Sequence, residues 1–259
     1  MPNNDLRDWR ISEIATRLTG DVPAAYPGGP SHKAGTAVYL ATIAKHEEYN
    51  TLGFVTPSPI ALALDIACKS SLEAERLRTS IPLEDAVTPW GQGKAVPKDD
   101  LPQLYDFFEC AMSAVTFSFQ SLESFANWVI GRRIKGSFPV QRRDQIVELA
   151  PHELERNLST EEKLAQVLPK VFGLPTPKGK KVWQGFKKLK HMRDSTIHLK
   201  SFDVAARQLD ERSLFFEFLN SRTTDFPKLA LEVIEYFYAK EDKPRWAKEF
   251  RALMCTGSH

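Results

Sequence analysis

The chain has 259 residues and few of the features that mark metalloproteins, secreted proteins or membrane proteins. It contains three cysteines, Cys68, Cys110 and Cys255, whose spacing is neither that of a zinc site nor that of a disulfide framework. Cys68 and Cys110 fall in apolar helical patterns, so we expect buried thiols in a reducing compartment. No run approaches the roughly 18 apolar residues of a membrane-spanning helix, and no early segment resembles a signal peptide. The sequence therefore predicts a cytoplasmic protein without a membrane partner.

Motifs for metal ions and for phosphate loops are also missing. Four histidines share no metal-ligand spacing with one another or with the cysteines: His32, His46, His152 and His191. We interpret them as surface or capping residues. The glycines at 28–29 and within 91–94 do not lie between an apolar strand and a helix, where a phosphate-binding loop is found. The sequence therefore predicts no metal site and no cofactor.

Apolar residues make up 42% of the chain, which is ordinary for a globular protein, and the net charge of +2 identifies no partner. We find no internal repeat and no convincing strand alternation. The apolar residues recur instead at helical spacing, so we expect an all-α fold, a helical bundle. The expected helices span residues 5–19, 37–49, 59–78, 100–130, 146–156, 159–171, 178–200, 213–219, 227–239 and 244–254.

The stretch 82–98 has few apolar residues and is broken by prolines and glycines. We place a domain boundary there. Residues 1–98 are then an N-terminal helical extension, and residues 99–256 are a helical domain. Residues 257–259 are interpreted as the remnant of a purification tag and carry no functional meaning.

The helix expected over 100–130 has the strongest apolar stripe of the chain, and we expect it to be buried on more than one side. Asp99 or Asp100 can cap its start, and Gly131 is expected to end it. Glu123 and Asn127 lie four residues apart and therefore on one face, amid aromatic residues. A buried Asn needs partners for its amide. Either Asn127 bonds to neighbouring backbone, or Asn127 and Glu123 face Arg193 and His198 across a groove between two helices.

The segment 178–200 is the most basic part of the chain and is expected to form one helix. Its apolar residues lie at helical spacing: Val182, Phe186, Leu189, Met192 and Ile197. With a second basic cluster upstream, its cations are candidates for an RNA-binding track. The candidates are Lys187, Lys188, Lys190, Lys200, Arg132 and Arg133.

This basic segment ends in Arg193-Asp194-Ser195-Thr196-Ile197-His198. The spacing alone also has a purely structural interpretation, because Asp194 can pair with His198 one turn away and a His near a helix C-terminus is favourable. On an ideal helix, residues five apart point about 140° from each other. Arg193 and His198 can therefore converge only if the helix loosens near Ser195, or else they address different parts of a cleft.

Two stretches together resemble the HEPN superfamily. They are Leu122-Glu123-Ser124-Phe125-Ala126-Asn127, in a core helix, and Met192-Arg193-Asp194-Ser195-Thr196-Ile197-His198. HEPN domains are all-α and carry an Arg followed, after four to six residues, by a His. The residue after the Arg is typically polar, and Asp194 fits this pattern. The resemblance covers roughly residues 100 to 240 and leaves the first hundred residues unexplained.

The resemblance implies a metal-independent ribonuclease that acts as a homodimer, with two Arg–His motifs facing one cleft. Arg193 would hold the phosphate, and His198 would move protons between the ribose 2′-OH and the leaving 5′-oxygen. Asp194 would orient one of the two, and Asn127, Glu123 and Ser195 would support them. The product would carry a 2′,3′-cyclic phosphate. The implied setting is bacterial antiviral defence or a toxin–antitoxin pair, with a protein regulator or antitoxin as partner.

Some HEPN proteins are instead modified by a partner nucleotidyltransferase on a Tyr two residues after the His. Lys200 stands at that position here, so such modification is not expected. Inactive family members also exist. The alternative function is therefore a catalytically silent helical module that binds RNA or protein, possibly within a larger complex.

Overall fold

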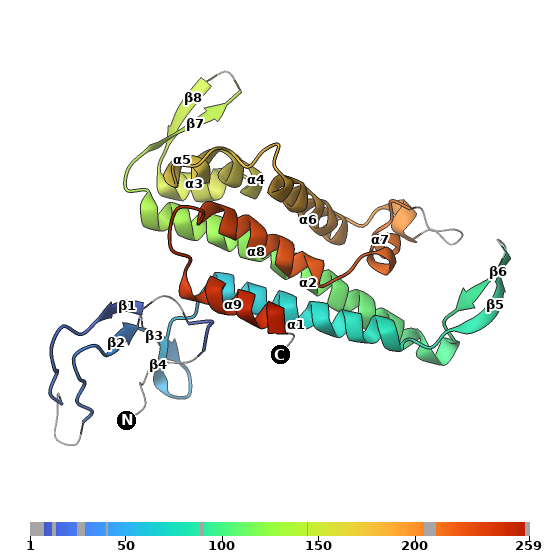
Figure 1. Ribbon diagram of the computed structural model, residues 1–259, viewed down its shortest axis with the longest axis horizontal. Coiled ribbons are helices and arrows are strands. Elements are labelled where there is room, and N and C mark those ends of the chain that lie inside the picture. The colour runs from blue at the N-terminus through green and yellow to red at the C-terminus, as the bar shows by residue number, and fades with distance from the viewer. Residues whose placement is uncertain are drawn as a thin grey trace. The chain divides into compact units, whose positions relative to one another are not determined.

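The computed structural model describes residues 8–11, 14–24, 29–39, 41–88, 91–143, 145–204 and 211–256. The chain forms two compact units, Met1–Leu62 with Lys243–Ser258, and Ala63–Asp242. The elements of the first unit are β1 (Ile14–Arg17), β2 (Ala37–Tyr39), β3 (Ala41–His46), β4 (Asn50–Val55) and α9 (Arg245–Thr256). Helix α1 (Pro59–Ser80) begins in this unit and continues into the larger one (Figure 1).

The larger unit contains two hairpins and most of the helices. Its first elements are β5 (Glu84–Thr88), β6 (Gly91–Ala95), η1 (Lys98–Asp100), α2 (Leu101–Arg133), β7 (Phe138–Arg142) and β8 (Gln145–Leu149). They are followed by α3 (Pro151–Asn157), α4 (Thr160–Glu162), η2 (Lys163–Val167), α5 (Leu168–Val171), α6 (Lys181–Ile197), η3 (Ser201–Val204), α7 (Leu214–Asn220) and α8 (Asp225–Phe237). The division expected at residue 98 stays a prediction, and residues 257–259 lie outside the described part of the chain.

The all-α class expected from the sequence is wrong. The structure is 56% helical, but 18% of it lies in small two-stranded antiparallel sheets, four of them among the described residues, so its class is mixed α/β. These pairs are β1–β2, β3–β4, β5–β6 and β7–β8. Where they are described, the segments 5–19, 37–49 and the start of 146–156 form strands and turns in place of the expected helices, and the expected loop 82–98 contains a hairpin.

The strands escaped prediction because most of their side chains face water. Strands β3 and β4 are exposed along most of their length, and Val87 of β5 is 88% exposed. A strand shows apolar and polar residues in alternation only when one of its faces is buried. Since these ribbons bury little, the alternation by which a strand is recognised is absent.

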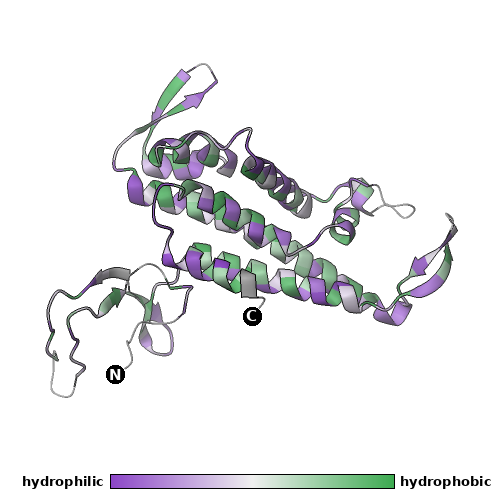
Figure 2. Ribbon diagram, viewed as in Figure 1, coloured by the Kyte–Doolittle hydropathy of each residue, from purple (hydrophilic) through white to green (hydrophobic). Residues whose placement is uncertain are grey.

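The core of the larger unit is built around α2. Helices α2, α6 and α8 pack against one another (Figure 1), and hydrophobic residues are interleaved with hydrophilic ones along all three (Figure 2). The ring of Phe125 lies 5.9 Å from that of Phe237, and Phe119 lies 6.2 Å from Phe186. Burying each such side chain contributes about 1.5–3 kcal/mol. The expected core helix is confirmed, although it continues past Gly131 to Arg133 and the Asp100 side chain makes no capping bond.

The other long helices agree with their apolar spacing. Helix α1 begins at the expected Pro59, and α6 fills the interior of the expected 178–200 segment. The capping box at Ser159 is formed, since Glu162 N donates to Ser159 Oγ at 3.2 Å and Ser159 N donates to Glu162 Oε2 at 2.8 Å. In the part of the chain that is described, no helix is long and apolar enough to span a membrane.

Candidate functional site

A pocket of about 390 Å³ lies between α2 and α6. Helix α2 lines it with Thr116, Phe119, Gln120, Glu123, Ser124 and Asn127, and the last turn of α6 adds Arg193 and Ile197. The α2 positions recur at three- and four-residue steps and therefore share one face of the helix. The pocket brings together Glu123, Asn127 and Arg193, which lie up to 70 positions apart in the sequence. The groove thus contains Arg193 but not His198, whereas the sequence alternative had Glu123 and Asn127 facing both.

Arg193 is held against the aromatic floor of this groove. Its guanidinium carbon lies 4.0 Å from the centre of the Phe119 ring, a cation–π distance, and its side chain is 25% exposed. Nη1 lies 3.2 Å from Asp194 Oδ1. The Nε atom is buried and has no hydrogen-bond partner among the described residues. A buried donor without a partner is unfavourable, so internal hydrogen bonding alone does not explain the position of Arg193.

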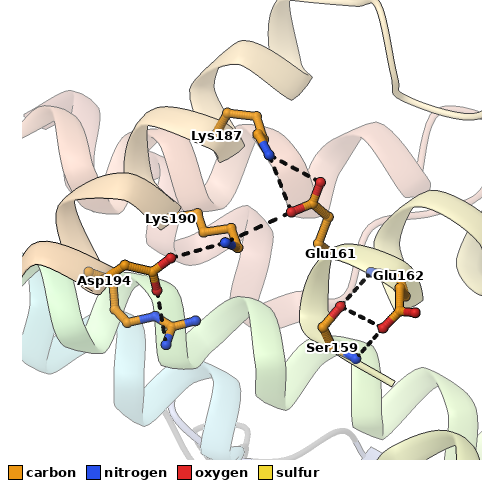
Figure 3. A network of polar contacts seen from close by, with 7 residues as sticks. Ser159, Glu161, Glu162, Lys187, Lys190 and Asp194 are labelled. Atoms are coloured by element: carbon orange, nitrogen blue, oxygen red, sulfur yellow. Dashed lines mark hydrogen bonds and ion pairs between the residues drawn. The ribbon is translucent and has the colours of Figure 1, made fainter. Parts of the chain in front are cut away.

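A chain of ion pairs extends from Arg193 along the exposed side of α6. Asp194 Oδ2 accepts from Lys190 Nζ at 3.0 Å, and Glu161 Oε1 lies 3.1 Å from Lys187 Nζ. Lys190 also approaches Glu161 at 4.0 Å, so Glu161 lies between the two lysines (Figure 3). Asp194 therefore holds Arg193 and Lys190. Asp194 does not pair with His198, although the spacing of the two residues in the sequence allowed that contact.

His198 lies at the C-cap of α6, outside the pocket lining. Its backbone N–H donates to Asp194 O at 2.9 Å, which closes the last helical turn. The imidazole is exposed and has no hydrogen bond or ion pair within the described part of the chain. Ser195 belongs to the regular helix, so the helix does not loosen there. Within one chain, Arg193 and His198 therefore address different regions, as the helical angle between them requires.

Asn127 is held by a residue that the sequence interpretation missed. Lys163 Nζ donates to Asn127 Oδ1 at 2.8 Å and to the Glu155 backbone carbonyl at 2.7 Å. The Lys163 side chain is only 1% exposed. Burial lowers its pKa, and the carboxylates of Glu123, Glu155 and Glu162 oppose that shift. One signal was available, because Lys163 lies four residues before Val167 and therefore on the buried stripe of its helix.

The side chains expected to bind RNA differ in whether they form ion pairs with acidic residues. Lys187 and Lys190 are paired with acids, as described above. Arg133 forms a bidentate pair with Glu241 at 2.9 and 2.6 Å, and Arg132 lies over the Trp128 ring. Lys200 lies 5.6 Å from the Phe202 ring. Lys188 is exposed and has no ion pair with a described residue. Three of the six expected cations, Lys187, Lys190 and Arg133, are therefore paired with acids, so only part of the expected basic track is neutralised.

The other candidate residues serve structural roles. His191 is exposed and its Nε2 lies 3.2 Å from Glu217 Oε1, which links α6 to α7. Cys68 is buried as expected, and burial raises the pKa of its thiol to about 11, whereas Cys110, which was also expected to be buried, is only partly buried. Among the described residues, no cluster of three or more His, Cys, Asp or Glu is placed to hold a metal ion.

Comparisons of the chain with protein-family models, with curated proteins and with solved structures found no match. The function is therefore argued from this pocket and from the end of α6.

Proposed function

We propose that the chain is a metal-independent endoribonuclease of HEPN type. The observation that supports this most is the state of Arg193, which lies in a pocket beside Glu123 and Asn127 with an unpartnered buried Nε. His198 follows one turn later on the same helix and is exposed. An Arg and a His at the end of one helix are the two groups that the resemblance requires.

The proposed reaction is an internal transesterification of RNA. The ribose 2′-oxygen attacks the adjacent phosphorus, the bond to the 5′-oxygen breaks, and the products are a 2′,3′-cyclic phosphate and a 5′-hydroxyl. His198 takes the 2′-OH proton or delivers one to the 5′-oxygen, because histidine exchanges protons readily near neutral pH. Arg193 stabilises the charge that develops on the phosphate. Asp194 acts on Arg193 rather than on His198, since its carboxylate contacts the guanidinium.

The proposal includes a homodimer. In one chain Arg193 lines the pocket and His198 does not, so a second copy facing this end of α6 would supply another His to the cleft. Two apolar side chains beside His198 are exposed, Ile197 at 53% and Leu199 at 49%. Exposed apolar side chains next to a motif are a feature of surfaces that bind another subunit. A role in bacterial defence or in a toxin–antitoxin pair, with a regulatory protein as partner, belongs to the same proposal.

The test is cleavage of a labelled RNA in EDTA by the wild type and by three variants. We expect the wild type and His191→Ala to cleave, because His191 is an exposed histidine of the same helix that pairs with Glu217. Arg193→Ala and His198→Ala should each lose activity by about a hundredfold or more, with the folded state retained. The product should carry a cyclic phosphate. Unchanged cleavage by His198→Ala would refute the assigned role of His198.

A catalytically silent binding module is the second candidate. The position of His198 outside the Arg193 pocket favours it, because one chain does not assemble both groups. In that case the purified wild type binds RNA without cleaving it, and His198→Ala binds equally well.

A further inference from the structure

The orientation of the Asn127 amide is determined by chemistry. Lys163 carries only donors, so the Asn127 atom 2.8 Å from its Nζ must be the oxygen. The amide nitrogen Nδ2 is therefore turned away from Lys163. It has no acceptor among the described residues, and Asn127 lines the pocket. The pocket thus contains an amide whose donor is free and whose acceptor is already bound.

The Asn127 amide is held by a buried ammonium, that of Lys163, which is unfavourable for stability. A residue present despite this cost suggests a role in function. A buried ammonium loses its hydration, and here it regains two hydrogen bonds, to Asn127 and to the Glu155 carbonyl. Lys163 begins a π-helical turn, in which the Leu168 N–H bonds to the Lys163 carbonyl five residues back. Such turns occur frequently at functional sites. Replacing Lys163 by an apolar residue would remove the cost of burying a charge, but it would also leave the Asn127 amide free to rotate.

Glu123 supplies the complementary group. It lies one turn before Asn127 on the same face of α2 and lines the same pocket. An ionised carboxylate only accepts hydrogen bonds, and Glu123 accepts none from the described residues. The pocket therefore presents a fixed donor, Asn127 Nδ2, beside two acceptor oxygens.

Among the four RNA bases, guanine matches this pattern best. Its Watson–Crick edge carries an acceptor, O6, followed by two adjacent donors, N1–H and the 2-amino group. O6 can accept from Asn127 Nδ2 while the two donors engage both oxygens of Glu123. Adenine and cytosine present a single amino group there, and uracil a single N–H, so each leaves one carboxylate oxygen unpaired. A volume of about 390 Å³ lies in the range of sites that hold ligands of this size.

We propose that this pocket is a guanine-recognition subsite and that Lys163 is its positioning residue, which holds the Asn127 amide with its donor toward the base. The proposal rests on RNA being the substrate of the same site. It assigns Glu123 and Asn127 to recognition of the base. Arg193 and His198 remain the groups that act on the phosphate.

The experiment measures binding of free mononucleotides to the full chain by NMR titration or calorimetry. GMP should bind about tenfold or more tightly than AMP, CMP or UMP, because a well-placed set of base-edge bonds discriminates by about 1–3 kcal/mol. IMP lacks only the 2-amino group and should bind with intermediate affinity. Equal affinity for all the nucleotides, or no binding of GMP, would overturn the proposal.

Variants then separate recognition from folding. Asn127→Asp keeps the size of the side chain and an acceptor for Lys163 but replaces the donor with an oxygen, so GMP affinity should fall about tenfold or more. Lys163→Met frees the amide to rotate and should reduce the preference for GMP. Gln184→Ala, an exposed uncharged position of α6, should leave it unchanged. A GMP preference that survives in a folded Asn127→Asp variant would exclude the assigned contact.

Failure of this proposal is distinguishable from failure of the nuclease proposal, because nucleotide binding does not require cleavage. A chain that cleaves RNA without preferring GMP is a nuclease that lacks this subsite. A chain that prefers GMP but cleaves no RNA has the subsite without the proposed activity.

Discussion

The ammonium of Lys163 lies 2.8 Å from the side-chain oxygen of Asn127, although the two residues are 36 positions apart. This contact connects the π-helical turn η2 to the face of α2 that lines the pocket. It places a buried positive charge directly behind a polar pocket wall.

The charge on Lys163 should make stability depend on alkaline pH. Burial lowers the pKa of Lys163 below that of the unfolded chain. Between the two pKa values the unfolded state binds the proton more strongly, so the free energy of unfolding rises with pH. This window ends near the ordinary lysine pKa of about 10.4.

Urea unfolding of the wild type and of Lys163→Met at several pH values from 7 upward tests this. The stability of the wild type relative to the variant should increase as pH approaches that limit. A difference that stays constant or decreases would contradict a buried, charged Lys163.

A larger residue at Gly185, where α6 contacts α8, should force the Leu229 side chain to shift. A Cβ added at Gly185 would lie 2.8 Å from Leu229 Cδ2, which is closer than carbon atoms approach. Alanine is favoured over glycine in a helix by about 1 kcal/mol, but overpacking typically destabilises by about 1–3 kcal/mol. Because the overlapped atom is the end of the partly exposed Leu229 side chain, which can rotate away, we expect the two effects to nearly offset and Gly185→Ala to change the free energy of unfolding by less than about 1 kcal/mol.

A double-mutant cycle provides the control. Leu229→Ala removes the atom that is overlapped, so Gly185→Ala in that background should be stabilising. If Gly185→Ala had the same effect in both backgrounds, the close approach to Leu229 would not contribute to it.

Asp194 should matter for RNA cleavage and little for stability. Its carboxylate is 39% exposed, and ion pairs at such positions contribute about 0–1 kcal/mol. Asp194→Asn retains the shape but weakens the hold on Arg193, so we expect cleavage to fall about tenfold while the unfolding midpoint changes little.

Glu161→Gln is the matched control, because it breaks ion pairs at the other end of the same network without touching Arg193. Its cleavage rate should stay within about twofold of the wild type, since exposed pairs contribute little. Equal losses in both variants would indicate a general effect of charge on RNA binding.

Cys68 should resist alkylation in the folded protein. Its side chain is buried, and burial raises the pKa of the thiol to about 11, so the reactive thiolate is scarce at pH 8. Iodoacetamide at pH 8, followed by mass spectrometry, should modify Cys68 only after denaturant is added. Rapid modification under native conditions would show that this part of α1 opens.

Amphipathic spacing was sufficient to predict the long helices, and it located α1, α2, α6, α8 and α9 to within a few residues. The physical reason is that each buries one continuous stripe, which imposes a period on the sequence. The Ser159–Glu162 capping box could also be predicted from the sequence, because its two hydrogen bonds depend on local spacing alone. The hairpins were not, because exposed ribbons such as β5–β6 bury too little to impose a period.

The candidate site shows the same division. The sequence by itself determined that Glu123 and Asn127 share a face of α2 and that Arg193 and His198 end a basic helix, because helical spacing is local. Only the tertiary structure decided that this face of α2 meets Arg193 and that Lys163 lies behind Asn127. It also placed the Arg193 guanidinium over the Phe119 ring and left His198 exposed. These outcomes depend on the packing of helices distant in the chain, which the spacing within one helix does not encode.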